Sequence, residues 1–226
     1  MSSAGPTFMT YSTLVSDMTA YLERGRTATS DPTVFAQIPR LINAAERKII
    51  QILKLQGTIE VLNDPSGFTP GISVIPKPNR WRETISFSYG SGVGSNTRKF
   101  LYPRVYEYCR AYWPDDSVQD VTQPPLFYSD YSYSHWLIAP TSPGIFPIEV
   151  VCYMQPPLLC EANQRNFFTD YTPNMLLYGA LLEATPFIKN DERIATWQAF
   201  YQLEISTLTN QDLQRILDRS AERKRP

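Results

Sequence analysis

The sequence predicts an α+β fold in which helices from the N- and C-terminal ends form an antiparallel bundle and a β-rich domain is inserted between them. Apolar residues recur at three- and four-residue spacing only near the two ends of the chain. The middle instead carries short β-type runs that proline and glycine interrupt. Neither helical end can bury its apolar stripe alone, so we expect the two ends to pack together. The predicted organisation is N-terminal helices in 1–57, an inserted β-rich domain in 58–160, and C-terminal helices in 161–226 that complete the bundle and end in a tail.

Two helices are expected in the N-terminal part. The first begins near Thr10 and ends before Gly25. Ser30-Asp31-Pro32 predicts the start of the second, because a capping side chain precedes proline in the first turn. Pro39 is expected to break or restart this helix, since proline lacks the amide hydrogen and clashes with the preceding turn. The clearest amphipathic stripe follows and ends at Gly57; it consists of Leu41, Ile42, Ala45, Ile49, Ile52 and Leu53.

The middle of the chain predicts strands. Alternation is clearest from Thr84 to Ser88, and the glycine-rich segment 90–96 that follows is expected to be a hairpin loop. Val105–Trp113 is expected to be a short helix that Pro114 closes. The expected strands are Thr58–Leu62, Trp81–Tyr89, Thr97–Tyr102, His135–Ala139 and Ile148–Met154.

Helical pattern returns near the C-terminus. Thr172-Pro173 predicts another capped start, and Pro186 ends that helix. Asn190 or Asp191 is expected to cap a long final helix. The charged tail Arg219–Pro226 is expected to fray or to dock on another protein.

Composition limits the class of protein. Of the 226 residues, 42% are hydrophobic and 19% charged, which is typical of a globular protein, and the net charge of -1 offers no cationic surplus for nucleic acid. The three cysteines lack the spacing of a disulfide framework or a zinc site and favour a reducing cytoplasm. Neither a signal peptide nor a membrane span is expected.

The 14 tyrosines suit either protein–protein surfaces or a small β core, and composition does not decide between them.

Motifs for catalysis, cofactors or metals are weak. His135 is the single histidine, and no nucleophile motif lies near it. The glycines 90–94 lack the lysine of a phosphate-binding loop. We therefore expect no catalytic, cofactor-binding or metal-binding residue. Two alternatives are a hydrolase of cell-wall glycans that uses acids among Glu107, Glu149 and Glu161, and a sugar-binding β module that uses the aromatics of Tyr128–Trp136.

Several segments, in this order, resemble the head-to-tail adaptor proteins of tailed bacteriophages, including the tail tubular adaptors of short-tailed phages. Ile38–Ile49 carries a hydrophobic pair followed by Ala-Glu and a basic residue, and Phe100–Pro114 carries Tyr-Glu-Tyr and Tyr-Trp-Pro. The similarity spans about Thr10 to Leu217. The remaining segments that carry it are Phe127–Tyr131, Trp136–Thr141, Asn163–Phe167, Leu177–Ala184 and Asn190–Arg193.

The resemblance implies a structural protein that joins the portal to the tail nozzle or tube in a homo-oligomeric ring, commonly dodecameric. Double-stranded DNA would pass through the ring without specific binding, in the virion neck after assembly in the host cytoplasm. A different neck or tail completion protein is the alternative. Portal-binding candidates on the final helix are Leu213, Arg215, Ile216, Arg219 and Arg223. Subunit or tail interface candidates are Tyr128, Tyr131, Tyr133 and Trp136, and channel-facing candidates are Asp115, Asp116 and Asp120.

Overall fold

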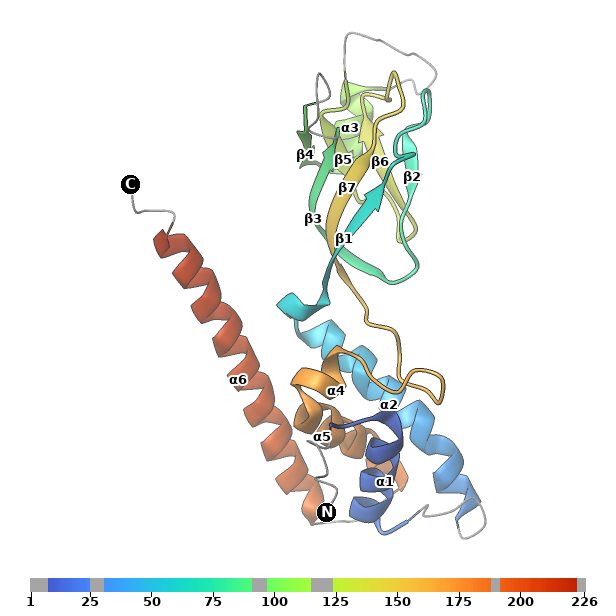
Figure 1. The fold of residues 1–226 in the computed structure, drawn as a ribbon, viewed down its shortest axis with the longest axis vertical. Coiled ribbons are helices and arrows are strands. Elements are labelled where there is room, and N and C mark those ends of the chain that lie inside the picture. Colours follow the sequence, from blue (N-terminus) through green and yellow to red (C-terminus); the bar gives the residue numbers. More distant parts are fainter. Residues whose placement is uncertain (1–7, 25–30, 91–96, 115–123, 188–191, 223–226) are drawn as a thin grey trace, which may run out of the picture. The chain divides into compact units, whose positions relative to one another are not determined.

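A computed structural model describes residues 8–24, 31–90, 97–114, 124–187 and 192–222, with the backbone alone for 212–222. The chain mixes helices and strands, which confirms the α+β class (Figure 1). Its contacts divide it into two compact units. One unit contains residues 1–58 and 156–226 and is called the helical unit; the other, 59–155, is called the β unit.

The helical unit is built around α5. This helix is largely apolar, and it packs against α1, α2, α4 and α6. The elements are α1 (Tyr11–Leu22), α2 (Pro32–Ile52), η1 (Gln56–Thr58), α4 (Phe167–Tyr171), α5 (Pro173–Glu183), η2 (Thr185–Phe187) and α6 (Arg193–Glu222). Its core joins both ends of the chain, because Leu14, Ile42 and Ile49 lie in the same buried cluster as Leu176 and Leu181. Burial of these side chains is the main source of stability for the unit.

The starts of α1 and α2 follow the capping signals of the sequence, whereas the Thr172 side chain makes no capping hydrogen bond at the start of α5. The predicted cap at Asn190 or Asp191 lies outside the described residues. Thr10 caps α1, and its side chain accepts a hydrogen bond from the Thr13 amide. Asp31 caps α2 in the same way through the Val34 amide, with Pro32 in the first turn. These side chains satisfy amide groups that have no partner inside a helix.

The prediction that Pro39 breaks or restarts the helix is wrong. Pro39 lies inside α2, which continues from Pro32 to Ile52. Its ring is exposed, whereas Ile38 and Ile42 beside it are fully buried in the core. Burial of these flanking side chains outweighs the lost backbone hydrogen bond, so tertiary packing decides this segment.

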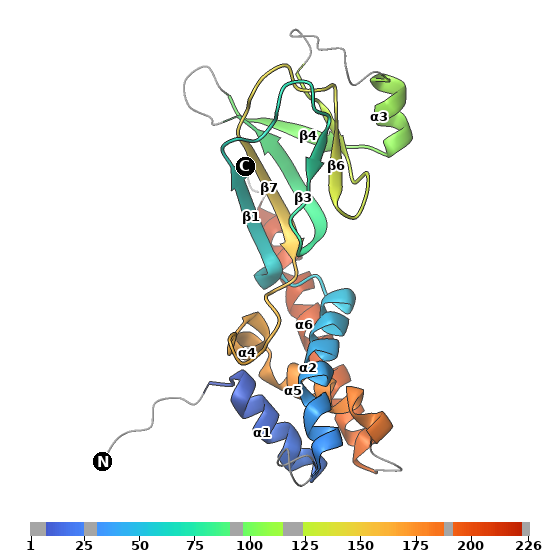
Figure 2. The same cartoon turned by 90° about the vertical axis from the view of Figure 1, so that its right-hand side faces the viewer.

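The β unit contains one sheet of seven strands in the order β1-β7-β3-β4-β5-β6-β2 (Figure 2). All neighbouring strands are antiparallel except β4 and β5, which are parallel. The five expected strands are present, and sequence reasoning missed β2 and β5, which have three residues each. The elements are β1 (Ile59–Asp64), β2 (Val74–Pro76), β3 (Trp81–Tyr89), β4 (Lys99–Pro103), α3 (Tyr106–Tyr112), β5 (Phe127–Ser129), β6 (His135–Ala139) and β7 (Ile148–Met154).

Aromatic side chains fill the core of the β unit. Phe87 is fully buried, and its ring lies 5.5 Å from that of Tyr128 and 5.4 Å from that of Trp136. Phe68 extends this cluster, with ring centroids 6.1 Å from Phe87 and 5.4 Å from Tyr89. Tilted and edge contacts of this kind stabilise aromatic pairs beyond the area they bury. These five aromatic residues thus belong to the core of the β unit.

Candidate functional site

Five rings on and beside α3 form two contact groups on the β unit, which together we call the aromatic surface: Tyr108, Tyr112 and Phe127 in one group, and Tyr106 and Tyr131 in the other. The four tyrosines are 40–45% exposed. Tyr108 and Tyr112, one turn apart on α3, hold their rings parallel and both meet the half-buried Phe127 edge-on, at 5.3 and 5.1 Å. Tyr106 stacks on Tyr131 at 5.5 Å. These contacts fix the rings before any partner binds, which lowers the entropic cost of binding.

Two arginines lie over this surface. The Arg104 guanidinium is 5.5 Å from the Tyr108 ring and 5.6 Å from the Phe127 ring, and Arg110 is 5.6 Å from the Tyr106 ring. Cations over ring faces are attracted by the ring quadrupole. Arginine and tyrosine together are the residue types that protein interfaces favour. The aromatic surface therefore has the chemistry of a protein-binding surface.

The four interface candidates from the sequence separate into two pairs. Tyr131 and Tyr133 are 45% and 75% exposed. Tyr128 and Trp136 are buried, with 4% and 2% exposed, so the structure corrects their placement: they belong to the core of the β unit. Burial, followed by the charges of Asp130 and Glu83, raises the pKa of Tyr128 to about 12. The phenol therefore stays neutral at physiological pH.

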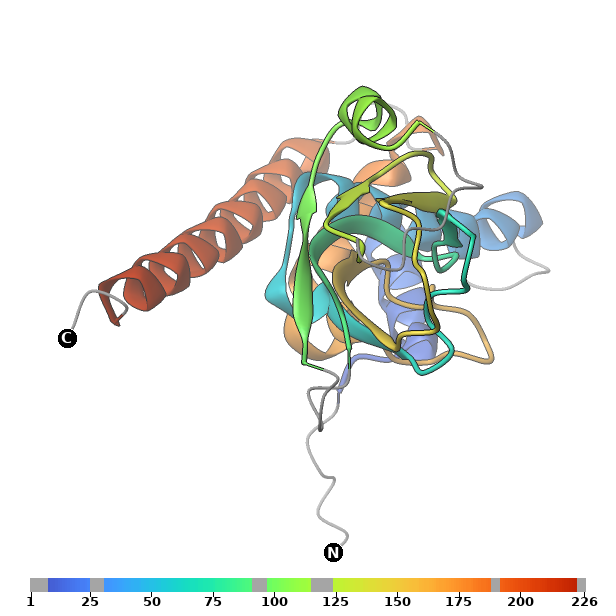
Figure 3. The same cartoon turned by 90° about the horizontal axis from the view of Figure 1, so that it is seen from above.

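The described part of the final helix, α6, is less buried toward its C-terminal end. Trp197 and Tyr201 are buried, Ile205 and Leu208 are half-buried, and residues 209–211 are exposed. The backbone continues as helix to Glu222, which is about 21 Å beyond Leu208 at about 1.5 Å per residue. In Figures 1 and 3 this C-terminal part of α6 runs past the other helices of the unit.

The portal-binding candidates lie on or beyond this segment. Leu213, Arg215, Ile216 and Arg219 fall within α6, where the structure describes the backbone but not the side chains. Arg223 lies outside the described residues, and so do the channel-facing candidates Asp115, Asp116 and Asp120.

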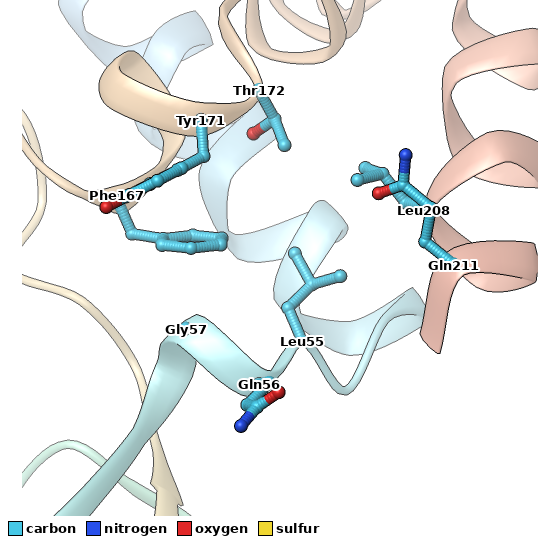
Figure 4. Close-up of a pocket in the computed structure, with 8 residues that line it drawn as sticks. All are labelled: Leu55, Gln56, Gly57, Phe167, Tyr171, Thr172, Leu208 and Gln211. Carbon is cyan, nitrogen blue, oxygen red and sulfur yellow. The ribbon is translucent and has the colours of Figure 1, made fainter. Parts of the chain in front are cut away.

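A pocket opens in the helical unit between the end of α2, α4 and α6 (Figure 4). Leu55, Phe167 and Leu208 supply its apolar wall, and Gln56 and Gln211 its polar edge. Gly57 lies against the Phe167 ring so closely that a β-carbon there would lie 1.8 Å from ring atom Cε2. Glycine is thus required by the close approach of this ring.

Substitution of Gly57 with alanine should displace the Phe167 ring and lower the free energy of unfolding by about 1–3 kcal/mol, the usual cost of overpacking. Urea unfolding would measure the loss. Phe167→Ala in the same chain removes the clashing ring, so the double variant should lose less than the two separate losses combined. Strictly additive losses would contradict the close-contact explanation.

A buried carboxyl fixes the segment that enters α4. Glu46 of α2 is fully buried, and its oxygens accept hydrogen bonds from the Asn166 amide group at 2.5 Å and the Leu159 backbone amide at 3.2 Å. In the amide orientation that satisfies both its polar atoms, Asn43 donates to Glu46 Oε2 at 3.0 Å. Burial raises the pKa of Glu46 to about 7, although these hydrogen bonds and the Arg47 charge lower it. Its contacts hold two distant segments together.

The acids considered for glycan hydrolysis lie on different elements of the chain. Glu149 on β7 makes a two-pronged ion pair with Arg98, at 2.7 and 2.9 Å. Glu107 is exposed on α3, and Glu161 belongs to the helical unit. His135 is half-buried, with Nδ1 2.8 Å from the neighbouring Ser134 hydroxyl.

The described residues contain no group of three or more histidine, cysteine or acidic side chains that could hold a metal ion. Cys109 and Cys152 are buried free thiols and Cys160 is an exposed one. Over the same described ranges, every helix is too short or too polar to cross a membrane.

Comparison with known proteins identifies the family. A family model described as the SU10 adaptor protein matches residues 9–225, which is nearly the whole chain. No curated protein matches the chain. The family is one of structural components of the virion, in accord with surfaces built for protein contacts. The chain therefore belongs to the SU10 adaptor family of bacteriophage structural proteins.

Proposed function

We propose that this adaptor joins the portal to the tail nozzle or tube, as one subunit of a homo-oligomeric ring that forms part of the DNA channel. The family match supports the adaptor role. The single observation that carries the finer proposal is the C-terminal part of α6, whose helical backbone continues for 14 residues after Leu208, the last residue of the helix that the structure describes as half-buried. A helical segment of this length that runs past the other helices of its unit suits insertion into a groove of a partner.

The organisation of the chain supports a scaffold that presents two kinds of surface. We propose that the helices from both ends form an antiparallel bundle and carry the β-rich domain as an insertion, with boundaries near residues 58 and 160. The end of α6 then binds the portal. The aromatic surface, together with Tyr133, then contacts the tail protein or a neighbouring copy. Acidic side chains at 115, 116 and 120 would face the channel and repel DNA phosphates, so that DNA passes without specific binding.

Truncation tests the portal assignment. A chain that ends at Gln211 should keep its fold, because the described side chains of the helical core lie before that residue. It should lose binding to the purified portal protein of the same phage at least about a hundredfold, since a docking helix supplies most anchoring contacts. Pull-down and light-scattering titration would measure binding, and circular dichroism would check the fold.

Tyr133→Ala is the matched control, because it alters an exposed residue of the other unit and should leave portal binding unchanged. Undiminished portal binding by the truncated chain would reject the α6 assignment. Binding of the full chain to tail protein but not to portal would indicate a tail completion protein instead.

A further inference from the structure

The helical unit presents two different surfaces on different sides of α5. Tyr178 and Glu183 are five residues apart on this helix, which places them about 140° apart around its axis. The Tyr178 ring lies 5.2 Å from the Phe200 ring of α6. The Glu183 carboxylate lies 2.9 Å from the Lys48 ammonium of α2. Two separate areas are therefore available to neighbouring molecules at once.

The first area, called the acidic aromatic face, consists of Asp17, Tyr21, Tyr178, Phe200 and Glu204. Tyr21 and Phe200 are 41% and 44% exposed, and with Tyr178 they line a shallow pocket. Arg193 also lines this pocket, and its charge is paired with Glu23 at 3.4 Å. Asp17 lies one turn before Tyr21 on α1, and Glu204 one turn after Phe200 on α6. Burial, then the phenol of Tyr21 and the charge of Glu204, raises the pKa of Tyr178, which places these groups close together. Carboxylates thus flank exposed rings.

The second area, called the basic α2 groove, consists of Ala36, Pro39, Ala44, Arg40 and Arg47. All five residues line one shallow groove along α2. Three are small or compact, which leaves room above the helix, and the two arginines are exposed. Within the described part of the chain, Arg40 and Arg47 form no ion pair, whereas their neighbour Lys48 pairs with Glu183. Among the described residues, the groove therefore presents two exposed cations that form no ion pair, although the Arg47 charge also acts on the buried Glu46 carboxyl.

We propose that the acidic aromatic face of one copy packs into the basic α2 groove of the next copy and so forms the subunit contact of the ring. The inference rests on the ring proposed above. Exposed rings with carboxylates at their edges complement a groove of small residues with arginines at its edges, in both shape and charge. Because the two areas are different surfaces of the same chain, the contact is head-to-tail and can repeat around a closed ring.

Charge reversal on each side tests the contact. We would prepare full chains with Arg40→Glu and Arg47→Glu, with Asp17→Lys and Glu204→Lys, and with all four changes. Each two-residue variant should lower the yield of rings at least about tenfold, since it places like charges opposite each other. The four-residue variant reverses both sides of every contact, so it should restore the yield to within about threefold of the original chain. Native mass spectrometry, with and without purified portal protein, would count the subunits.

Arg82→Glu with Lys99→Glu is the matched control, since both residues are exposed cations of the β unit; this variant should assemble normally. Subunits of the four-residue variant should not mix with the original chain in one ring, because mixed contacts juxtapose like charges. Normal assembly of either two-residue variant, or failure of the four-residue variant while circular dichroism shows a folded chain, would overturn the inference. If the variant with Arg40→Glu and Arg47→Glu forms normal rings but loses binding to portal or DNA, the inference is also overturned, and the groove is assigned to that partner. If the original chain forms no ring even with portal, the proposed ring itself fails.

Discussion

Substitution of Glu46 with alanine should lower the free energy of unfolding of the helical unit by roughly 3–5 kcal/mol at neutral pH. The change leaves the buried Leu159 amide without its acceptor. The Asn166 and Asn43 side chains each lose one of two acceptors, because Asn166 also donates to the Pro157 carbonyl and Asn43 to the Leu159 carbonyl. Each buried donor without a partner costs about 1–3 kcal/mol. The missing side chain also leaves a cavity between α2 and the segment that enters α4. Urea unfolding followed by circular dichroism would measure the loss.

The Glu46 carboxyl should also make the free energy of unfolding depend on pH. Its pKa is raised from the ordinary 4.5 to about 7 in the folded chain. Below pH 4.5 the group is protonated in both states; between about 4.5 and 7 the unfolded chain releases the proton while the folded chain keeps it. The folded state then binds more protons, so this group's contribution to stability is lost as pH rises through that window, by about 3 kcal/mol.

Glu46→Gln isolates this effect, because glutamine keeps the shape of the neutral acid but does not titrate. The free energy of unfolding of the variant should therefore increase relative to that of the original chain as the pH rises from about 4.5 to 7. Glu183→Gln is the control: its ion pair with Lys48 is partly exposed, so it should cost no more than about 1 kcal/mol. A pH-independent difference for Glu46→Gln would contradict the raised pKa.

Local signals in the sequence are strong enough to predict most elements. A capping side chain followed by proline marks the start of α2, and alternation marks β3, because these patterns act through backbone hydrogen bonds and side-chain direction within a few residues. The continuous path of α2 through Pro39 was not predictable in this way. It depends on the burial of Ile38 and Ile42 against residues more than a hundred positions away in the chain. Likewise, β2 and β5 have only three residues each, and they are strands because they pair with β6, which local sequence patterns do not reveal.

The candidate surfaces were harder to predict than the fold. A tyrosine suits a core and an interface equally well, so the sequence could not separate Tyr128 from Tyr131. The continuous apolar run Trp136–Ala139 offered one usable signal, since such a run is typical of a strand buried on both faces, and all four of its side chains are buried. Sequence reasoning missed Tyr106, Tyr108 and Tyr112 as surface candidates. Their closeness in one short helix was a signal, but their contact with Phe127 and Tyr131 depends on the folded sheet.

Trp136→Ala should lower the free energy of unfolding of the β unit by about 3–5 kcal/mol, as large-to-small changes in a core usually do. The side chain is 2% exposed, and its indole nitrogen donates to the Thr84 hydroxyl at 2.8 Å. Thr84 in turn donates to Asp130, which pairs with the buried Lys77 ammonium at 3.1 Å. The lysine also lies 3.4 Å from the Trp81 ring and 5.8 Å from the Trp136 ring. Loss of the indole therefore removes both packing volume and one member of a polar network.

Tyr133→Ala is the informative comparison, because this side chain is 75% exposed and should change stability by no more than about 0.5 kcal/mol. The two variants thus separate the two roles that composition leaves open for an aromatic residue. Thermal and urea unfolding would measure stability, and capture of the tail nozzle or tube protein would measure binding. If Tyr133 contributes to the tail contact, its variant loses capture at unchanged stability, whereas the Trp136 variant loses both together. A stable Trp136→Ala chain with unchanged unfolding would show that the aromatic core assigned to the β unit is wrong.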